Sequence, residues 1–264
     1  MIEHRWELWL ACWGAGALLL GLLYALQVRT RNATAVDAGW ACSLVLAGIL
    51  CAALGPGRLE HRILIATLAG LENLRIGLLV LRRLGADEDS RYRDLRERWS
   101  RRRREQRTFA AFYQAQALVA AVLAVPFVLT SFNRADGLAV VEWLGVALWL
   151  AAASLELVAD EQLRRFKAAN RGGTMRRGLW RYSRHPNYFF QTLTWVAYAL
   201  IAVAAPYGWL AFLPAALILY LVLFVTGVKP AEEQALRSRG DDFRQYQRET
   251  SPFIPWFPRS STAS

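Results

Sequence analysis

Long apolar blocks separated by polar connections dominate the sequence. The blocks lie at residues 6–27, 36–54, 62–81, 108–130, 138–158, 188–205 and 208–228. A bilayer core about 30 Å thick needs about 20 apolar residues per helix. The pattern therefore predicts an all-α, multi-pass transmembrane helix bundle of about seven spans, with residues 1–264 forming a single integral membrane domain.

The connections between the blocks carry turn signals. Gly55-Pro56-Gly57 and Pro206-Tyr207-Gly208 predict helix breaks and hairpin turns. The first block is too long for the hydrophobic part of a signal peptide and has no convincing small-residue cleavage site, so we expect a retained helix.

Composition narrows the class of protein further. Hydrophobic residues make up 55% of the chain and aromatic residues 12%, which excludes disordered, collagen-like and ordinary soluble proteins. The three cysteines lie inside apolar blocks at spacings unlike those of a metal site. We therefore expect no metal centre.

Basic residues set the expected orientation. The net charge is +11, and the positive residues concentrate in residues 82–107, 160–184 and 229–264. The positive-inside rule places these segments in the cytoplasm and the N-terminus outside. Residues 87–107 are predicted to form an amphipathic helix on the anionic inner leaflet, and residues 229–264 a cytoplasmic segment. Charge confined to connections argues against nucleic-acid binding.

Two polar clusters interrupt the apolar blocks. Glu72, Asn73 and Arg75 lie in the third block, where Glu72 and Arg75 share a helix face and form either a structural ion pair or part of a site. Asp160 and Lys167 belong to a stripe with Glu156 and Arg164 that leaves the fifth block. This stripe suits a phosphate-bearing ligand or is an ordinary amphipathic helix end.

A third cluster opens the sixth block. The run Gly178–Phe189 reads GLWRYSRHPNYF, and its Pro186 suits the first turn of a helix. Asn187, Gln191, Thr194 and Tyr198 then recur along one helix face. Amide groups of this kind suit a carboxamide or an amino-acid headgroup, and the nearby arginines add positive potential for an anion.

Several ordered motifs resemble one membrane-protein superfamily. Besides Gly178–Phe189 they are the segments at residues 32–37, 87–92, 159–167 and 250–258. They are similar to those of bacterial membrane proteins grouped with the steroid 5-alpha-reductase C-terminal domain, a superfamily shared with isoprenylcysteine carboxyl methyltransferases and sterol reductases. The resemblance implies a seven-helix bundle with an NADPH site open to the cytosol and a lipophilic substrate that enters from the bilayer.

The resemblance also assigns roles by position. Asn187 matches the residue that holds the nicotinamide carboxamide, Asp160 an acid beside the polar part of the cofactor, and Lys167 a phosphate contact. The other residues implied in cofactor binding are Arg75, Arg181, Arg184, His185, Tyr188, Gln191, Glu232, Glu233 and Tyr246. Two positions depart from the reductase pattern of Gly-Glu. Phe190 replaces the glycine, so it is expected to face lipid or narrow the pocket, and uncharged Gln191 replaces the glutamate.

These features predict an NADPH-dependent reductase of an activated C=C bond in a steroid-like or isoprenoid lipid. Glu72 is the expected acid that polarises the substrate carbonyl. The alternatives are a lipid methyltransferase that uses S-adenosylmethionine and a non-catalytic relative that binds lipid or a partner. We expect a bacterial inner-membrane protein with its cofactor pocket facing the cytoplasm, in contact with membrane lipids and not with nucleic acid. The oligomeric state is left open.

Overall fold

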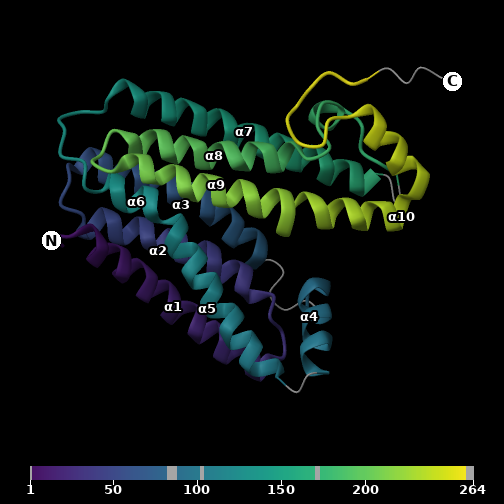
Figure 1. Cartoon of the computed structure of the whole chain (residues 1–264), viewed down its shortest axis with the longest axis horizontal. Coiled ribbons are helices and arrows are strands. Elements are labelled where there is room, and N and C mark those ends of the chain that lie inside the picture. Colours follow the sequence, from purple (N-terminus) through teal and green to yellow (C-terminus); the bar gives the residue numbers. More distant parts are fainter. Residues whose placement is uncertain (1, 82–87, 102–103, 170–172, 260–264) are drawn as a thin grey trace. The chain divides into compact units, whose positions relative to one another are not determined.

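The computed structural model describes residues 2–81, 88–101, 104–169 and 173–259, with the side chains of residues 74–81 and 90 outside the description. Helices account for most of these residues (Figure 1). In chain order they are α1 (Arg5–Thr30), α2 (Ala35–Leu54), α3 (Leu59–Leu81), α4 (Ser90–Ser100), α5 (Glu105–Leu123), α6 (Val125–Thr130), α7 (Val140–Ala169), η1 (Gly178–Arg181), α8 (Pro186–Val203), η2 (Gly208–Ala211), α9 (Phe212–Tyr220), η3 (Leu221–Val225) and α10 (Val228–Glu249).

The described chain confirms the all-α prediction. It contains no strand, and its one isolated bridge pairs Ser183 with Ser251. Five of its helical stretches are long and apolar enough to cross a membrane, namely those at residues 5–30, 35–54, 105–130, 140–169 and 208–249. The predicted blocks at residues 62–81 and 188–205 also form helices, α3 and α8, but these are not among the five. A count of seven spans stays a prediction.

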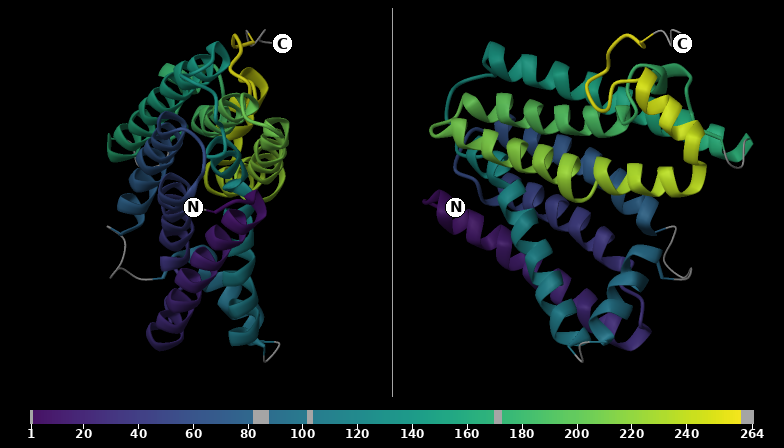
Figure 2. Two further views of the ribbon diagram at one scale, coloured as in Figure 1. Left: turned by 90° about the vertical axis from the view of Figure 1, so that its left-hand side faces the viewer. Right: turned by 45° about the vertical axis from the view of Figure 1, so that its right-hand side comes forward.

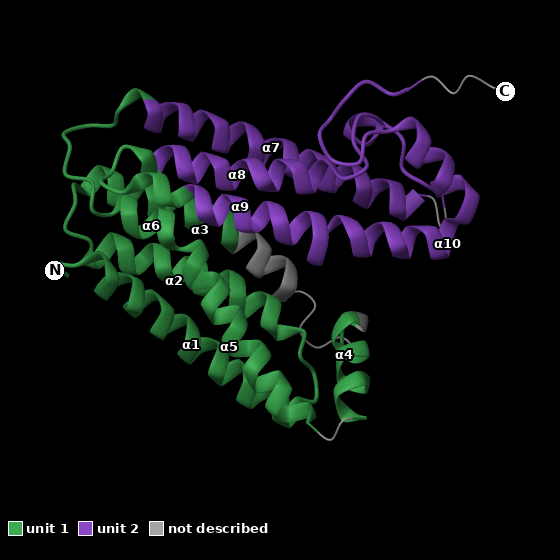
Figure 3. Cartoon of the chain, viewed as in Figure 1, with its two compact units in different colours: residues 1–140, 202–211 green, residues 141–201, 212–264 purple. Residues whose placement is uncertain are grey.

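The chain divides into two compact units, coloured separately in Figure 3. Unit 1 comprises Met1–Val140 and Ala202–Ala211, and unit 2 comprises Val141–Ile201 and Phe212–Ser264. Each unit is built from helices whose apolar residues pack together. That the two form a single membrane domain stays a prediction.

Unit 1 is organised around α2. This helix contacts both α1 and α3, while α1 also contacts α5. Small residues dominate the buried face of α2, including Ala38, Ala41 and Ala47, which lets neighbouring backbones approach closely. Large apolar side chains such as Leu18 and Leu22 of α1 are more than 60% exposed, as expected for a helix surface that faces lipid.

The helix predicted within residues 87–107 is present as α4. Asp89 caps it by accepting a hydrogen bond from the backbone N–H of Arg91. Its Tyr92 and Trp99 pack into an apolar cluster with Phe109 and Tyr113 of α5. Tyr92 is therefore buried and Trp99 half-buried against the rest of unit 1, and the position of α4 on the inner leaflet stays a prediction.

Unit 2 contains the long helix α7 beside α8, as both views of Figure 2 show. The two helices approach closely at Gly145, where an added Cβ would lie 3.0 Å from the carbonyl oxygen of Ala197. After α9 and the π-helical turn η3, α10 carries mainly polar residues and bends at Gly240, whose backbone is non-helical. This bend lets the chain return towards the start of α8.

Candidate functional site

The segment before α8 is shaped by a few specific contacts. Gly178 adopts a φ of +59°, which disfavours other residues, and an added Cβ would clash with the side chain of Gln162. That side chain accepts a hydrogen bond from the backbone N–H of Leu179 at 3.0 Å. The indole of Trp180 donates to the carbonyl oxygen of Ala159 at 2.9 Å. These contacts attach η1 to α7 before Pro186 begins α8.

The structure brings together Asp160 of α7 and Asn187 of α8. The Asn187 side-chain nitrogen donates to Asp160 Oδ1 at 3.0 Å. An ionised carboxylate only accepts hydrogen bonds, so this contact fixes which end of the amide is its NH2 group. The other end, Asn187 Oδ1, is buried and has no hydrogen-bond partner among the described residues. It is therefore an acceptor that a ligand with an N–H group would satisfy.

Beside this pair lies a second polar cluster centred on Glu232 of α10. Arg184 Nε donates to Glu232 Oε1 at 2.7 Å, and His185 Nε2 lies 3.2 Å from the same oxygen. Burial would raise the pKa of Glu232, but hydrogen bonds from His185 and Arg184 outweigh it and lower that pKa to about 2. Glu232 is thus ionised at neutral pH and forms an ion pair with Arg184.

These groups border one cavity of about 480 Å³, which we call the Asn187 cavity. It is lined by Leu163, Phe166, Lys167, Gly173, Thr174, Met175, Trp180, Arg184, His185, Asn187, Tyr188, Ala231, Gln234, Ala235, Ser238, Arg239, Phe243 and Tyr246. Among these described lining residues are three cationic side chains and no carboxylate. The cavity therefore favours an anionic ligand with an aromatic or apolar part.

Apart from Tyr246, the α10 residues that line this cavity were not among the predicted site residues. This α10 wall presents Ala231, Gln234, Ala235 and Ser238, which follow one helix face, and then Arg239. The Arg239 guanidinium lies 5.2 Å from the centre of the Phe243 ring. The recurrence of small and polar residues on this helix face was visible in the sequence, but any solvated helix shows the same pattern.

The end of α10 and the following tail close the site. Tyr246 is buried, and its hydroxyl donates to the backbone carbonyl oxygens of Trp180 and Ser183. Burial raises the pKa of this phenol well above its usual range, so it remains a hydrogen-bond donor at neutral pH. Arg184 binds the carbonyl oxygens of Gln247 and Thr250 at 2.9 and 2.8 Å. The tail and the start of α8 are thus held together.

Six of the predicted cofactor residues line the Asn187 cavity: Lys167, Arg184, His185, Asn187, Tyr188 and Tyr246. The rings of His185 and Tyr188 stack with centroids 5.6 Å apart. Asp160 and Glu232 lie directly behind this lining through the hydrogen bonds described above. The sequence prediction and the geometry therefore converge on one part of unit 2.

The other predicted residues of unit 2 lie elsewhere. Gln191 is half-buried and is not among the lining residues, and Arg181 is exposed beside a different cleft. Glu233 is exposed and lies 3.8 Å from Arg237. Phe190 was expected to face lipid or narrow the pocket. Instead it is 7% exposed, does not line the cavity and packs edge-on against Phe189.

Two predicted residues belong to unit 1. Glu72 is buried in α3 with 7% of its surface exposed, next to Asn73, whose side chain donates to the Ala69 carbonyl oxygen at 2.9 Å. The side chain of Arg75 lies outside the described residues. The role of both residues stays a prediction.

Comparison with known protein families gives one match. The family model described as "Protein of unknown function (DUF1295)" covers residues 23–250. Neither the curated proteins nor the solved structures gave a significant match. Because the matched segment includes most of both units and the whole lining of the Asn187 cavity, we conclude that the chain belongs to the DUF1295 family, which is generally linked to steroid 5-alpha-reductase-like proteins.

Proposed function

We propose that the protein is a membrane-embedded reductase that uses NADPH to reduce an activated C=C bond in a steroid-like or isoprenoid lipid. The observation that carries this proposal is the buried acceptor Asn187 Oδ1, oriented by Asp160 at a cavity whose charged lining residues are all basic. The proposal places the protein in a bacterial inner membrane with this cavity on the cytoplasmic side.

The cavity residues fit the chemical groups of the cofactor. A nicotinamide carboxamide has an NH2 group that would satisfy Asn187 Oδ1. Lys167 and Arg239 would hold phosphate oxygens, since ammonium and guanidinium groups form charge-assisted hydrogen bonds with them, whereas Arg184 is already bound to Glu232 and to two backbone carbonyl oxygens. The stacked pair of His185 and Tyr188 gives a flat surface for a ring. At about 480 Å³ the cavity is within the usual size range of ligand pockets, roughly 300–1,000 Å³.

The residues of the chain divide the work of the proposed reaction. When bound, NADPH would supply the hydride. Asn187 would orient the ring that carries it, and the basic residues would hold the phosphates. Hydride addition to the C=C bond of an enone also needs one proton, which an acid would donate to the carbonyl oxygen; the enol so formed would then tautomerise to the saturated ketone. Glu72, a carboxyl group buried in an apolar helix, is the proposed donor.

The methyltransferase alternative has less support from the geometry. S-adenosylmethionine carries a cationic sulfonium and an ammonium group, which call for nearby carboxylates or aromatic faces. Glu232 is already paired with Arg184 and hydrogen-bonded to His185, and Glu233 is exposed. With no carboxylate among the described lining residues, the cavity is better matched to an anionic cofactor.

Titration of the detergent-solubilised protein with NADPH, NADH and S-adenosylmethionine tests the proposal. We expect NADPH to raise the melting temperature most, because a ligand that binds only the folded state stabilises it by mass action. Preferential stabilisation by S-adenosylmethionine would overturn the choice of cofactor. NADPH binding without oxidation by a broad panel of enone lipids in nanodiscs would instead favour the non-catalytic relative.

A further inference from the structure

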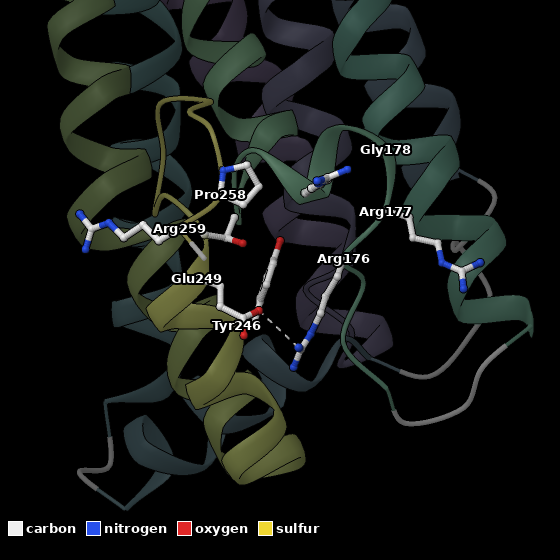
Figure 4. Close-up of a pocket in the computed structure, with 9 residues that line it drawn as sticks. Arg176, Arg177, Gly178, Tyr246, Glu249, Pro258 and Arg259 are labelled. Carbon is white, nitrogen blue, oxygen red and sulfur yellow. Dashed lines mark ion pairs between the residues drawn. The ribbon is translucent and has the colours of Figure 1, made fainter. Parts of the chain in front are cut away.

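A second cleft opens at the end of unit 2, on the other side of the loop that carries Gly178. We call it the arginine cleft. It has a volume of about 440 Å³ and is drawn in Figure 4. Its lining residues are Arg176, Arg177, Gly178, Arg181, Tyr246, Glu249, Thr250, Pro258 and Arg259. None of the residues assigned to cofactor binding lies in it except Arg181 and Tyr246.

The charges around the arginine cleft are unbalanced. Arg176 is paired, with Asp242 at 2.6 Å and with Glu249 at 3.6 Å. Arg177, Arg181 and Arg259 are exposed and form no ion pair within the part of the chain that the structure describes. Figure 4 shows Arg177 and Arg259 extending to opposite sides of the opening. The cations therefore form a rim around the cleft, as expected for contact with several anionic groups at a surface.

Large apolar side chains stand beside this rim. Ile254, Trp256 and Phe257 of the tail are 61%, 69% and 77% exposed. They are held in place, because the Trp256 N–H donates to the Tyr182 carbonyl oxygen at 2.9 Å and the Phe257 ring meets the Tyr182 ring edge-on. The Arg259 N–H donates to the Glu249 carbonyl oxygen at 2.9 Å. An ordered tail that exposes aromatic rings next to arginines has the composition of a membrane-interface contact.

The position of the cleft along unit 2 agrees with a place at the membrane interface. The apolar part of α7 ends near Ala159, to which Trp180 is hydrogen-bonded, and the loop with Arg176–Arg181 follows. The cleft is thus at the polar end of apolar helices, where phospholipid phosphates lie. A soluble anion would use the arginines, but it would leave the exposed tail rings without a partner.

We infer that the arginine cleft and the adjoining tail bind headgroups of anionic phospholipids, with phosphate groups around the rim at Arg177, Arg181 and Arg259 and the acyl boundary at Trp256 and Phe257. This site goes beyond the proposed reductase activity and does not depend on it. Each arginine supplies fork-shaped donors for phosphate oxygens, and each ring supplies an amphipathic surface for the interface.

The test compares lipid binding by the full chain and its variants in detergent, using native mass spectrometry and melting temperature. The probes are phosphatidylglycerol, phosphatidylcholine, inorganic phosphate and NADPH. The test variant is Arg181→Gln with Arg259→Gln. Its matched control, Arg165→Gln with Arg237→Gln, removes the same charge from exposed positions outside both cavities.

We expect phosphatidylglycerol to bind the natural protein and the control more tightly than phosphatidylcholine does. In the test variant we expect the affinity for phosphatidylglycerol to fall about tenfold, so that most of this preference is lost. A second variant, Trp256→Ser with Phe257→Ser, should bind phosphatidylglycerol more weakly and bind inorganic phosphate as the natural protein does. Equal loss in the control pair would mean a non-specific charge effect and would overturn the inference. Displacement of the lipid by inorganic phosphate or NADPH at similar concentrations would also overturn it, because the cleft would then take a soluble anion.

Discussion

At the scale of single residues, the orientation of one amide defines the site. The side-chain amide of Asn187 has a donor NH2 group and an acceptor oxygen, and the hydrogen bond to Asp160 fixes the position of each. Both residues could be predicted from the sequence, because both lie in motifs that resemble those of the steroid 5-alpha-reductase superfamily. Their contact, across 27 positions of the chain, could not be predicted without the packing of α7 against α8.

Replacing the orienting carboxylate should weaken cofactor binding. Asp160→Asn offers both a donor and an acceptor to Asn187, so the amide loses its single orientation. We expect NADPH affinity to fall about tenfold, the equivalent of about 1.4 kcal/mol. Glu161→Gln is the control, since Glu161 pairs with the exposed Arg164 and Arg165 instead. NADPH affinity is measured by titration calorimetry. An unchanged affinity in Asp160→Asn would show that the orientation of Asn187 by Asp160 does not contribute to cofactor binding.

Glu232 should give the protein a pH-dependent stability. Its pKa in the folded state is about 2, below the usual value of 4.5, so its stabilising contribution is present above pH 4.5 and is lost as the pH falls towards 2. We expect the melting temperature to fall over this interval, and to fall less steeply in Glu232→Gln. Glu233→Gln, with its exposed side chain, should follow the natural protein. Parallel curves for all three proteins would contradict the assigned role of Glu232.

At the scale of elements, α4 shows how charge and apolar surface act together. Arg96 binds Glu88 at 2.7 Å and Glu105 at 2.6 Å, and all three side chains are less than 20% exposed. Its guanidinium also lies 4.7 Å from the centre of the Phe109 ring. The basic composition of the segment predicted a surface helix. The sequence did not reveal these ion pairs, because Glu88 and Glu105 belong to the same highly charged segment as Arg96.

Loss of Arg96 should weaken the attachment of α4 to the rest of unit 1. Arg96→Gln leaves two partly buried carboxylates without their cation, and we expect a destabilisation of about 1–3 kcal/mol. Trypsin should then cut residues 88–101 faster than in the natural protein. The exposed Arg98 supplies a matched variant, Arg98→Gln, that keeps the ion pairs. Equal cleavage rates in the two variants would show that Arg96 does not hold the helix.

The α10 wall of the site was the element least accessible to sequence reasoning. Its residues Gln234, Ser238 and Arg239 resemble those of any solvated helix. They follow η3, and the bend at Gly240 then turns Phe243 and Tyr246 of the same lining; neither feature has a strong pattern in a single sequence. By contrast, the blocks that became α1, α2 and α7 were predictable, since a long apolar run has few alternatives to a helix.

At the scale of the whole molecule, an odd number of spans would place the two termini on opposite sides of the membrane. Five helical stretches of the described chain are long and apolar enough to span, and α3 and α8 complete the predicted seven. With seven spans and an N-terminus outside, as predicted, the basic segments at residues 160–184 and 229–264 would lie in the cytoplasm.

Labelling of introduced cysteines tests this orientation. In a chain with Cys12, Cys42 and Cys51 replaced by Ala, we expect Glu3→Cys to react with an impermeant maleimide from outside intact cells. Arg237→Cys should react only after the membrane is opened. Both native positions are exposed, so reactivity reports the side of the membrane and not burial. Labelling of both sites from one side would require an even number of spans.

Tyr246 borders both cavities of unit 2, and its ring lies 5.8 Å from the Arg176 guanidinium. Its hydroxyl is held by two backbone carbonyl groups, so the ring has little freedom to turn away. Because this ring belongs to the lining of both the Asn187 cavity and the arginine cleft, a charge bound at one of them acts on the other over a short distance. The lipid composition of the bilayer would therefore tune nucleotide affinity, even without any movement of the backbone.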